Sequence, residues 1–281
     1  MDTENMHEDF ALLRQAKPPF ELSRDESWDQ LLEKIEVGTP LRSLKQSRRI
    51  WVWAVAASVF LFCLSFWAAK QYSTSYYTPL AQQDTLYLPD SSQVILRAGS
   101  RISFKPIWWL LAREVQFEGE AFFSVKKGAQ FRVLSKAGQT AVLGTRFKIN
   151  TFAEHYDVYC QEGRVGVSRL EGSDSFFLAS GERLSLVDGQ LKKASGTDAQ
   201  SLAWLKQQFY FDRTPLTEVL AEIERSYAIE IQYRPPSAAP QLLSAAFDQP
   251  DNPDEALKII CEVFDLQLKE ISGDRFYLIT Q

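Results

Sequence analysis

The pattern of hydrophobic and polar positions divides the chain into one long apolar run and three patterned regions around it. Residues 50–69 carry no charge, and their only hydroxyl groups belong to Ser58 and Ser65. As a helix this run would be about 30 Å long, the thickness of a bilayer's hydrocarbon core. We expect a single transmembrane helix, because a cleaved signal sequence or a buried core helix fits the run's position and its flanking tryptophans less well.

Charge on either side of this run predicts its orientation. Basic residues crowd the N-terminal side, whereas Lys70 alone follows the run before a neutral stretch. The basic residues are Arg42, Lys45, Arg48 and Arg49. By the positive-inside rule, residues 1–49 are expected in the cytoplasm and the chain beyond residue 70 across the membrane.

Residues 1–49 form a short segment with two amphipathic patterns. Ser23 and Glu26 have the spacing of a helix capping box. The apolar stripe that follows them consists of Trp28, Leu31, Leu32 and Ile35, and a weaker upstream stripe consists of Met6, Phe10 and Leu13. So short a segment can hardly bury both stripes in a core of its own, which indicates a partner.

Acidic residues surround these stripes. The first 36 residues contain ten carboxylates and four basic side chains. An acidic amphipathic helix suits a partner with a basic surface and an apolar groove, such as a DNA-binding protein. A solvated helix near the membrane is the alternative, although the anionic inner membrane surface would repel it.

Beyond the apolar run, the pattern changes to short alternating segments. Residues 70–83 are polar and are expected to form a stalk. Over residues 84–189, alternating segments follow one another between turn signals such as PDSS and ASGE, which predicts an all-β domain, either a β-sandwich or a rolled antiparallel sheet. Small and polar residues over 190–201 predict a linker.

Residues 202–281 combine helical spacing of apolar residues with strand-like alternation, which predicts a small α+β domain. Thr214 and Pro215 are expected to begin a helix as N-cap and first residue, and Asn252 begins another before Pro253. AIEIQY and LLSAAF are typical of strands, and LQLKEI and RFYLIT of a hairpin. A shift of 37 residues superimposes the two helix-strand patterns, which indicates an internal repeat.

Candidate chemistry is sparse. His7 and His155 are the only histidines and are expected on opposite sides of the membrane, so no histidine triad or zinc cluster can be assembled. No nucleotide-binding motif occurs, and no cofactor is expected. The three cysteines do not make a disulfide framework, because Cys63 lies in the apolar run and Cys261 on the apolar face of a helix.

Three local features leave alternatives open. Glu118 and Glu120 could share a strand face as a carboxylate pair, although a strand edge or turn explains them better. In VLGTRF, the Thr145 hydroxyl could attack the carbonyl of Gly144 in an N-to-O acyl shift. The apolar IWWLL over residues 107–111 is either an exposed membrane or protein contact or a buried connection.

The segments beyond the apolar run resemble a known family. REVQFEGEAFFSV and FRVLSKAGQTAVLGTRFKINTF resemble successive strands of the FecR family of transmembrane anti-sigma regulators. AWLKQQFYFDRTPLTEVLAEIERSYAIEIQY resembles the C-terminal domain of the Bacteroidetes branch, which is similar to the signalling domain of secretins and TonB-dependent receptors. The resemblance covers about residues 84–281, with PDSS and RFKI in place of the more usual PDGS and RFNV.

The resemblance implies a binding protein rather than an enzyme. The chain would be a single-pass protein of the inner membrane that relays a signal from a TonB-dependent outer-membrane receptor to a cytoplasmic extracytoplasmic-function (ECF) sigma factor. Some family members are cleaved at the position of Gly144 and Thr145. The expected sigma-binding residues are Phe10, Leu13, Trp28, Leu31, Leu32 and Ile35.

The receptor is expected to bind the C-terminal domain by strand addition to RFYLIT or AIEIQY. The residues expected to bind it are Ile229, Ile231, Phe276, Tyr277, Leu278 and Ile279. Two other classes of protein remain open: a membrane-tethered carbohydrate-binding or hydrolytic protein, whose site would use Glu118 and Glu120, and a structural tether.

Overall fold

A computed structural model describes residues 24–36, 45–152, 155–169, 175–187, 189–197, 201–233, 241–272 and 276–280. The backbone divides into two compact units, Met1–Leu64 and Ser65–Gln281. Helix α2 (Arg24–Glu36) confirms the helix expected in the N-terminal segment. Helix α3 (Lys45–Gln71) includes the apolar run, and its Ile50–Gln71 portion is long and apolar enough to cross a membrane.

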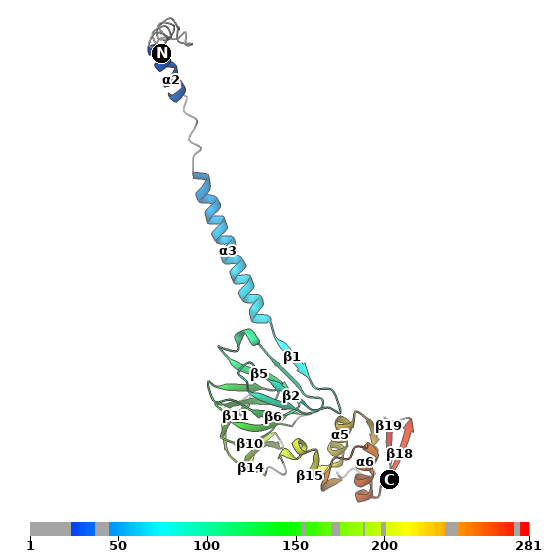
Figure 1. The fold of residues 1–281 in the computed structure, drawn as a ribbon. Coiled ribbons are helices and arrows are strands. Elements are labelled where there is room, and N and C mark those ends of the chain that lie inside the picture. The colour runs from blue at the N-terminus through cyan, green and yellow to red at the C-terminus, as the bar shows by residue number, and fades with distance from the viewer. Residues whose placement is uncertain are drawn as a thin grey trace, which may run out of the picture. The chain divides into compact units, whose positions relative to one another are not determined.

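The second unit contains two seven-stranded sheets, which Figure 1 shows as a layered β domain. In spatial order, the first sheet consists of β1 (Thr74–Tyr77), β4 (Arg101–Phe104), β5 (Arg113–Glu118), β7 (Phe131–Leu134), β8 (Gly138–Val142), β11 (Arg164–Arg169) and β12 (Ser175–Ala179). The second consists of β14 (Gln190–Ser195), β13 (Glu182–Val187), β10 (Asp157–Glu162), β9 (Arg146–Asn150), β6 (Glu120–Ser124), β3 (Gln93–Leu96) and β2 (Asp84–Tyr87). Only the β5–β7 pair is parallel among these described strands.

The two sheets form a sandwich because their inward-facing residues share one core. Phe117 of the first sheet meets Phe123 of the second edge to face, with ring centroids 5.6 Å apart. Phe123 also stacks on Phe147 of the neighbouring strand, and Val115 and Ile149 are completely buried in the same cluster. The structure thus confirms the all-β domain that the alternating pattern predicted, and the domain is of the sandwich type.

The β domain is longer at both ends than the sequence indicated. Residues 74–77, expected in a stalk, form β1 and pair with β4. Residues 190–195, expected in a linker, form β14 and pair with β13. Both strands lie at sheet edges and their side chains are mostly exposed, so they lack the apolar alternation by which the inner strands were recognised.

The C-terminal region is α+β, as predicted. Its elements are η2 (Ala203–Lys206), β15 (Gln208–Pro215), α5 (Leu216–Tyr227), β16 (Glu230–Tyr233), β17 (Leu242–Asp248), α6 (Pro253–Phe264), β18 (Gln267–Ser272) and β19 (Phe276–Thr280). β15 pairs with β17, and a second sheet has the order β16-β19-β18. Both helices bury one apolar face in a shared core, and each is followed by a strand, in agreement with the internal repeat.

Two details of this region test the expected helix starts. Asn252 caps α6 as predicted, because its side chain accepts a hydrogen bond from the backbone N–H of Asp254. The predicted start of α5 was wrong by one residue: Pro215 is the N-cap, and Thr214 pairs in β15 with Leu243 of β17. Cys261 is buried as expected, and it and Cys160 are free thiols.

Gly119 carries the chain from β5 in one sheet to β6 in the other. Its φ is +123°, and a Cβ at this position would lie 2.6 Å from the Cα of Ser100. Ser100 in turn donates its hydroxyl to the backbone oxygen of Glu120 at 2.9 Å. The glycine is therefore required both for its conformation and for this close approach.

A pair of glycine substitutions separates these two requirements. We expect Gly119→Ala to lower the free energy of unfolding by more than Gly181→Ala, because Gly181 also has a positive φ, +80°, but has open space around it. The conformational strain is about 1–2 kcal/mol in both variants, and the clash with Ser100 adds about 1–3 kcal/mol to the first alone. Urea unfolding of the full chain in detergent micelles measures both, and equal losses would contradict the close approach.

Candidate functional site

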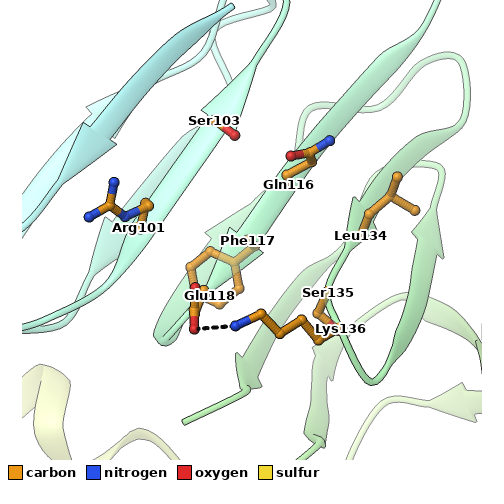
Figure 2. Close-up of a pocket in the computed structure, with 8 residues that line it drawn as sticks. All are labelled: Arg101, Ser103, Gln116, Phe117, Glu118, Leu134, Ser135 and Lys136. Carbon is orange, nitrogen blue, oxygen red and sulfur yellow. Dashed lines mark hydrogen bonds and ion pairs between the residues drawn. The ribbon is translucent and has the colours of Figure 1, made fainter.

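The outer face of the first sheet has a shallow hollow of about 360 Å³, drawn in Figure 2. Residues of β4, β5 and the end of β7, and of the turn after β7, line it. Its one carboxylate, Glu118, is exposed and pairs with exposed Lys136 at 3.0 Å. Phe117, the one aromatic residue in the lining, is buried in the core. The hollow therefore lacks the two carboxylates and aromatic platform that a carbohydrate site would need.

Glu118 and Glu120 do not form a carboxylate pair. The turn at Gly119 places Glu118 at the surface of the first sheet and Glu120 in the second sheet, where Glu120 is 4% exposed. Nor is there, within the described ranges, a group of three or more His, Cys, Asp or Glu side chains that could hold a metal ion.

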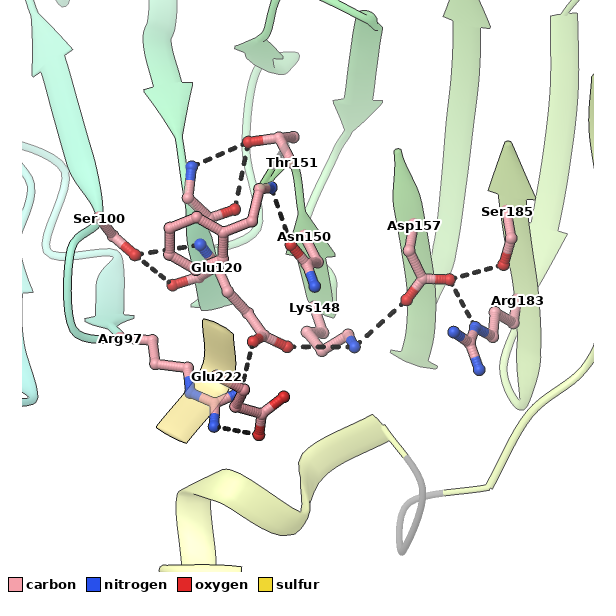
Figure 3. Close-up of polar contacts among 12 residues, drawn as sticks. Arg97, Ser100, Glu120, Lys148, Asn150, Thr151, Asp157, Arg183, Ser185 and Glu222 are labelled. Carbon is pink, nitrogen blue, oxygen red and sulfur yellow. Dashed lines mark hydrogen bonds and ion pairs between the residues drawn. The ribbon is translucent and has the colours of Figure 1, made fainter. Parts of the chain in front are cut away.

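Glu120 instead belongs to a row of buried charges on the outer face of the second sheet (Figure 3). Lys148 of β9 lies between Glu120 of β6 and Asp157 of β10, and its Nζ is 3.2 Å from a carboxylate oxygen of each. The row continues to Arg183 of β13, which donates to Asp157, and to Arg97, whose Nη1 is 2.7 Å from Glu120. We call these five residues the charge row.

Alternation along the strands explains why the charge row is on the outer face. Phe147 and Ile149 of β9 are in the sandwich core, so Lys148 between them must face the other way. It is nevertheless only 6% exposed. An apolar cluster of Phe122, Tyr159, Leu202 and Trp204 covers this face, with the last two contributed by the segment that leads into the C-terminal region.

Mutual pairing keeps the charge row ionised at neutral pH. Burial alone would raise the pKa of Glu120, but the charges of Lys148 and Arg97 outweigh it and hold this pKa below its usual value. The pKa of Asp157 is lowered in the same way by Lys148 and Arg183 against the effect of burial. Burial opposes the charged form of Lys148, yet the two carboxylates raise its pKa.

Arg97 connects the charge row to the C-terminal region. Its Nη2 is 2.6 Å from Glu222 of α5, and its guanidinium lies 5.7 Å from the ring centroid of Trp204. One arginine thus contacts β6, α5 and η2. Its side chain is only 14% exposed, so these ion pairs are largely removed from water.

The polar face of α5 makes further contacts with the β domain. His155 Nε2 is 3.3 Å from a carboxylate oxygen of Glu218, and the guanidinium of Arg225 lies 4.3 Å from the ring centroid of Phe152. The backbone oxygen of Arg225 accepts a hydrogen bond from Ala81 N–H at 2.9 Å. Glu218, Glu222 and Arg225 are spaced so that they share one helix face, opposite the residues that α5 buries in its own core. This face, with Arg97, Phe152 and His155, is here called the junction.

The expected sigma-binding residues are described in part. Trp28, Leu31 and Leu32 lie on α2 and are 50–56% exposed. Ile35 belongs to the same helix, but its side chain lies outside the described residues, as do Phe10 and Leu13.

One of the two strands expected to offer a free edge is not an edge strand. β19, which contains Phe276, Tyr277, Leu278 and Ile279, lies between β16 and β18 and is paired on both sides. Its composition could not reveal this, because the central position follows from the parallel pairing with β16. β16 is an edge strand, although the N–H of its Ile231 already donates to Glu224 at 2.7 Å, and Ile229 just before it is buried.

Gly144 and Thr145 lie in the short connection between β8 and β9. A Cβ on Gly144 would be 2.6 Å from the Cα of Lys127, which explains the glycine. The Thr145 hydroxyl donates to the backbone oxygen of Arg164 at 2.9 Å and is buried. For an acyl shift it would have to leave this acceptor and turn toward the carbonyl of Gly144.

Two family models match the chain and together cover more than half of it. The model described as FecR protein matches residues 74–166, and the model described as FecR, C-terminal matches residues 208–278. The chain belongs to the FecR family of anti-sigma factors. The first match begins at β1, in agreement with the strand that the sequence pattern did not reveal.

Solved structures share this FecR fold. A protein from Parabacteroides distasonis, described as a candidate anti-sigma factor, has crystal structures at 2.50 Å and 1.65 Å resolution. The first aligns with a TM-score of 0.68 and 24% identity over 75% of this chain and 99% of its own. The second aligns with a TM-score of 0.67 and 24% identity over 74% and 99%. No curated protein matches the sequence.

Removing the central cation of the charge row tests its role in this FecR domain. We expect Lys148→Met to lower the free energy of unfolding by about 3–5 kcal/mol at pH 7, because Glu120 and Asp157 lose the cation between them. Lys136→Met removes an exposed lysine from an ion pair with Glu118 and should change little. Urea unfolding of the full chain in detergent micelles measures both.

The same experiment has an expected pH dependence. The lowered pKa values of Glu120 and Asp157 mean that their stabilisation of the wild type is complete above about pH 5 and is lost as pH falls through the folded-state values. In Lys148→Met the two carboxylates can relieve their burial by taking up protons. The deficit should therefore shrink as the pH is lowered from 7 toward 4, and a constant deficit would contradict an electrostatic role.

Proposed function

We propose that the protein is a single-pass inner-membrane regulator that relays a signal from a TonB-dependent outer-membrane receptor to a cytoplasmic ECF sigma factor. Membership of the FecR family supports the sigma partner in general. The observation that carries the proposal for this chain is the exposed stripe of α2, where Trp28, Leu31 and Leu32 have no core to cover them in the described structure.

The chemistry of α2 suits a partner that also binds DNA. Its apolar stripe is bordered by Asp25, Glu26, Asp29 and Glu33. A sigma factor presents basic surfaces to the DNA phosphates, and an acidic helix could cover such a surface while its stripe enters an apolar groove. The basic residues before the apolar run support a cytoplasmic position for α2.

At the other end of the chain, the C-terminal region is the proposed receptor contact. The family match over residues 208–278 and the edge position of β16 support this. Strand addition there would require Glu224 to release the N–H of Ile231. Because Glu224 belongs to α5, receptor binding at β16 would act directly on the helix whose polar face forms the junction.

Self-processing between Gly144 and Thr145 remains a further proposal. The buried hydroxyl of Thr145 is one residue from the carbonyl that it would attack, and that carbonyl belongs to a position that only glycine fits. Mass spectrometry that finds only intact chain after long incubation of the purified protein would contradict it.

Sigma binding is tested on the full chain in lipid nanodiscs, titrated with each ECF sigma factor of the cell. We expect one sigma factor to bind tightly, and Trp28→Ala and Leu32→Ala each to weaken it by about tenfold or more, as loss of a buried apolar anchor does. Gln30→Ala is the matched control, because Gln30 is exposed on the opposite face of α2.

Two outcomes would contradict the proposal. Absence of binding to any of the sigma factors would remove the proposed output. Binding that Trp28→Ala and Leu32→Ala leave unchanged would show that the stripe of α2 is not the contact.

A further inference from the structure

The connection between β4 and β5 is an apolar tip, residues 106–111, that the proposed relay leaves unexplained. It contains η1 (Pro106–Trp108), Trp109, Leu110 and Leu111. Trp109 is 4% exposed, and its ring meets Phe104 and Phe131 at 5.4 and 5.9 Å between centroids. This tryptophan anchors the tip in the sandwich core and thereby fixes the residues on either side of it.

The residues after this anchor point away from the core. Leu110 is 98% exposed and Leu111 is 77% exposed, and Ile107 before it is 56% exposed. A polar turn would serve to connect β4 to β5, so two adjacent, almost completely exposed leucines need another explanation.

The chain path places the tip beside the end of α3. The helix ends at Gln71, and Thr74, three residues later, pairs with Phe104 at the end of β4. At about 3.3 Å per residue, Thr74 is at most about 10 Å from the helix end at Gln71, and Thr74 pairs with the strand that leads into the tip.

Side-chain contacts of Trp108 support the same placement. Its indole Nε1 donates to the backbone oxygen of Ala69 at 3.3 Å, and its ring meets Phe66 edge to face at 5.2 Å. Phe66 and Ala69 belong to the last two turns of the portion of α3 that is apolar enough to cross a membrane. The tip therefore lies at the level where the apolar helix ends.

We propose that the apolar tip inserts into the outer leaflet of the same membrane that α3 spans, with lipid acyl chains covering Leu110 and Leu111. The inference rests on the proposed function, in that it takes α3 to be transmembrane. A lipid surface is the occupant favoured by the continuity of the tip with the end of this helix.

Charge and aromatic residues around the tip fit the lipid interface. Between Arg101 and Arg113 the chain has no carboxylate, so nothing in this stretch repels anionic headgroups. Tyr72, Tyr76 and Tyr77 follow α3 directly and are 43–58% exposed, as expected of aromatic residues at a membrane interface. With one contact through α3 and another through the tip, the membrane would hold the β domain in a single orientation.

Fluorophores on exposed cysteines test the insertion in the full chain, reconstituted in nanodiscs with and without lipids that carry a quencher on the acyl chain. Native Cys63 in α3 reports on the span itself. For the tip, Leu110→Cys is combined with Cys63→Ser. Phe177→Cys in the same background is the control, because Phe177 is 75% exposed on β12, at the opposite edge of the first sheet from β1. Cys160 and Cys261 are buried, and the Cys63→Ser chain alone measures their labelling.

We expect the Leu110→Cys label to emit at shorter wavelength and to lose intensity to the quencher, while the Phe177→Cys label keeps its intensity. If only the Cys63 label is quenched, the helix spans the bilayer but the tip does not enter it, and the inference is wrong. A Leu110→Cys label that is shifted but not quenched would mean that protein, not lipid, covers the tip. A Cys63 label that is not quenched would overturn the membrane span and the docking together.

Discussion

Arg97 is shared between two carboxylates from separate parts of the chain, and the arrangement of the second unit depends on this sharing. Glu120 comes from the β domain and Glu222 from α5, and the guanidinium lies between them with only 14% of the side chain exposed. Because a guanidinium keeps its charge, loss of either carboxylate would leave a largely buried cation less well paired. The charge row extends this constraint through Lys148 to β10 and β13.

This arrangement gives a physical route for the proposed relay. The polar face of α5 meets the β domain at Arg97, Phe152 and His155, while its apolar face belongs to the core of the C-terminal region. A receptor that changes the position of α5 would have to break or reorganise ion pairs that are largely shielded from water. Such contacts have discrete arrangements, which is the property that a signal-transmitting interface requires.

The sequence predicted the parts that have strong periodicity and missed those defined by pairing across the chain. The stripe of α2, the apolar run of α3, the inner strands and the cap at Asn252 follow from local pattern. β1 and β14 were missed because they are exposed edge strands, which do not require alternating apolar residues. The central position of β19 depends on its parallel pairing with β16, and the role of Arg97 depends on partners 23 and 125 residues away, which one sequence does not display.

A double-mutant cycle between Arg97 and Glu222 tests most directly whether the two parts of the second unit are coupled through this ion pair. Arg97→Met, Glu222→Gln and the double variant are compared with wild type by urea unfolding of the full chain in detergent micelles. We expect a coupling free energy of about 1 kcal/mol or more, with the double variant less destabilised than the sum of the single variants. Additive effects would contradict it, because they would show that the β domain and α5 do not depend on each other through Arg97.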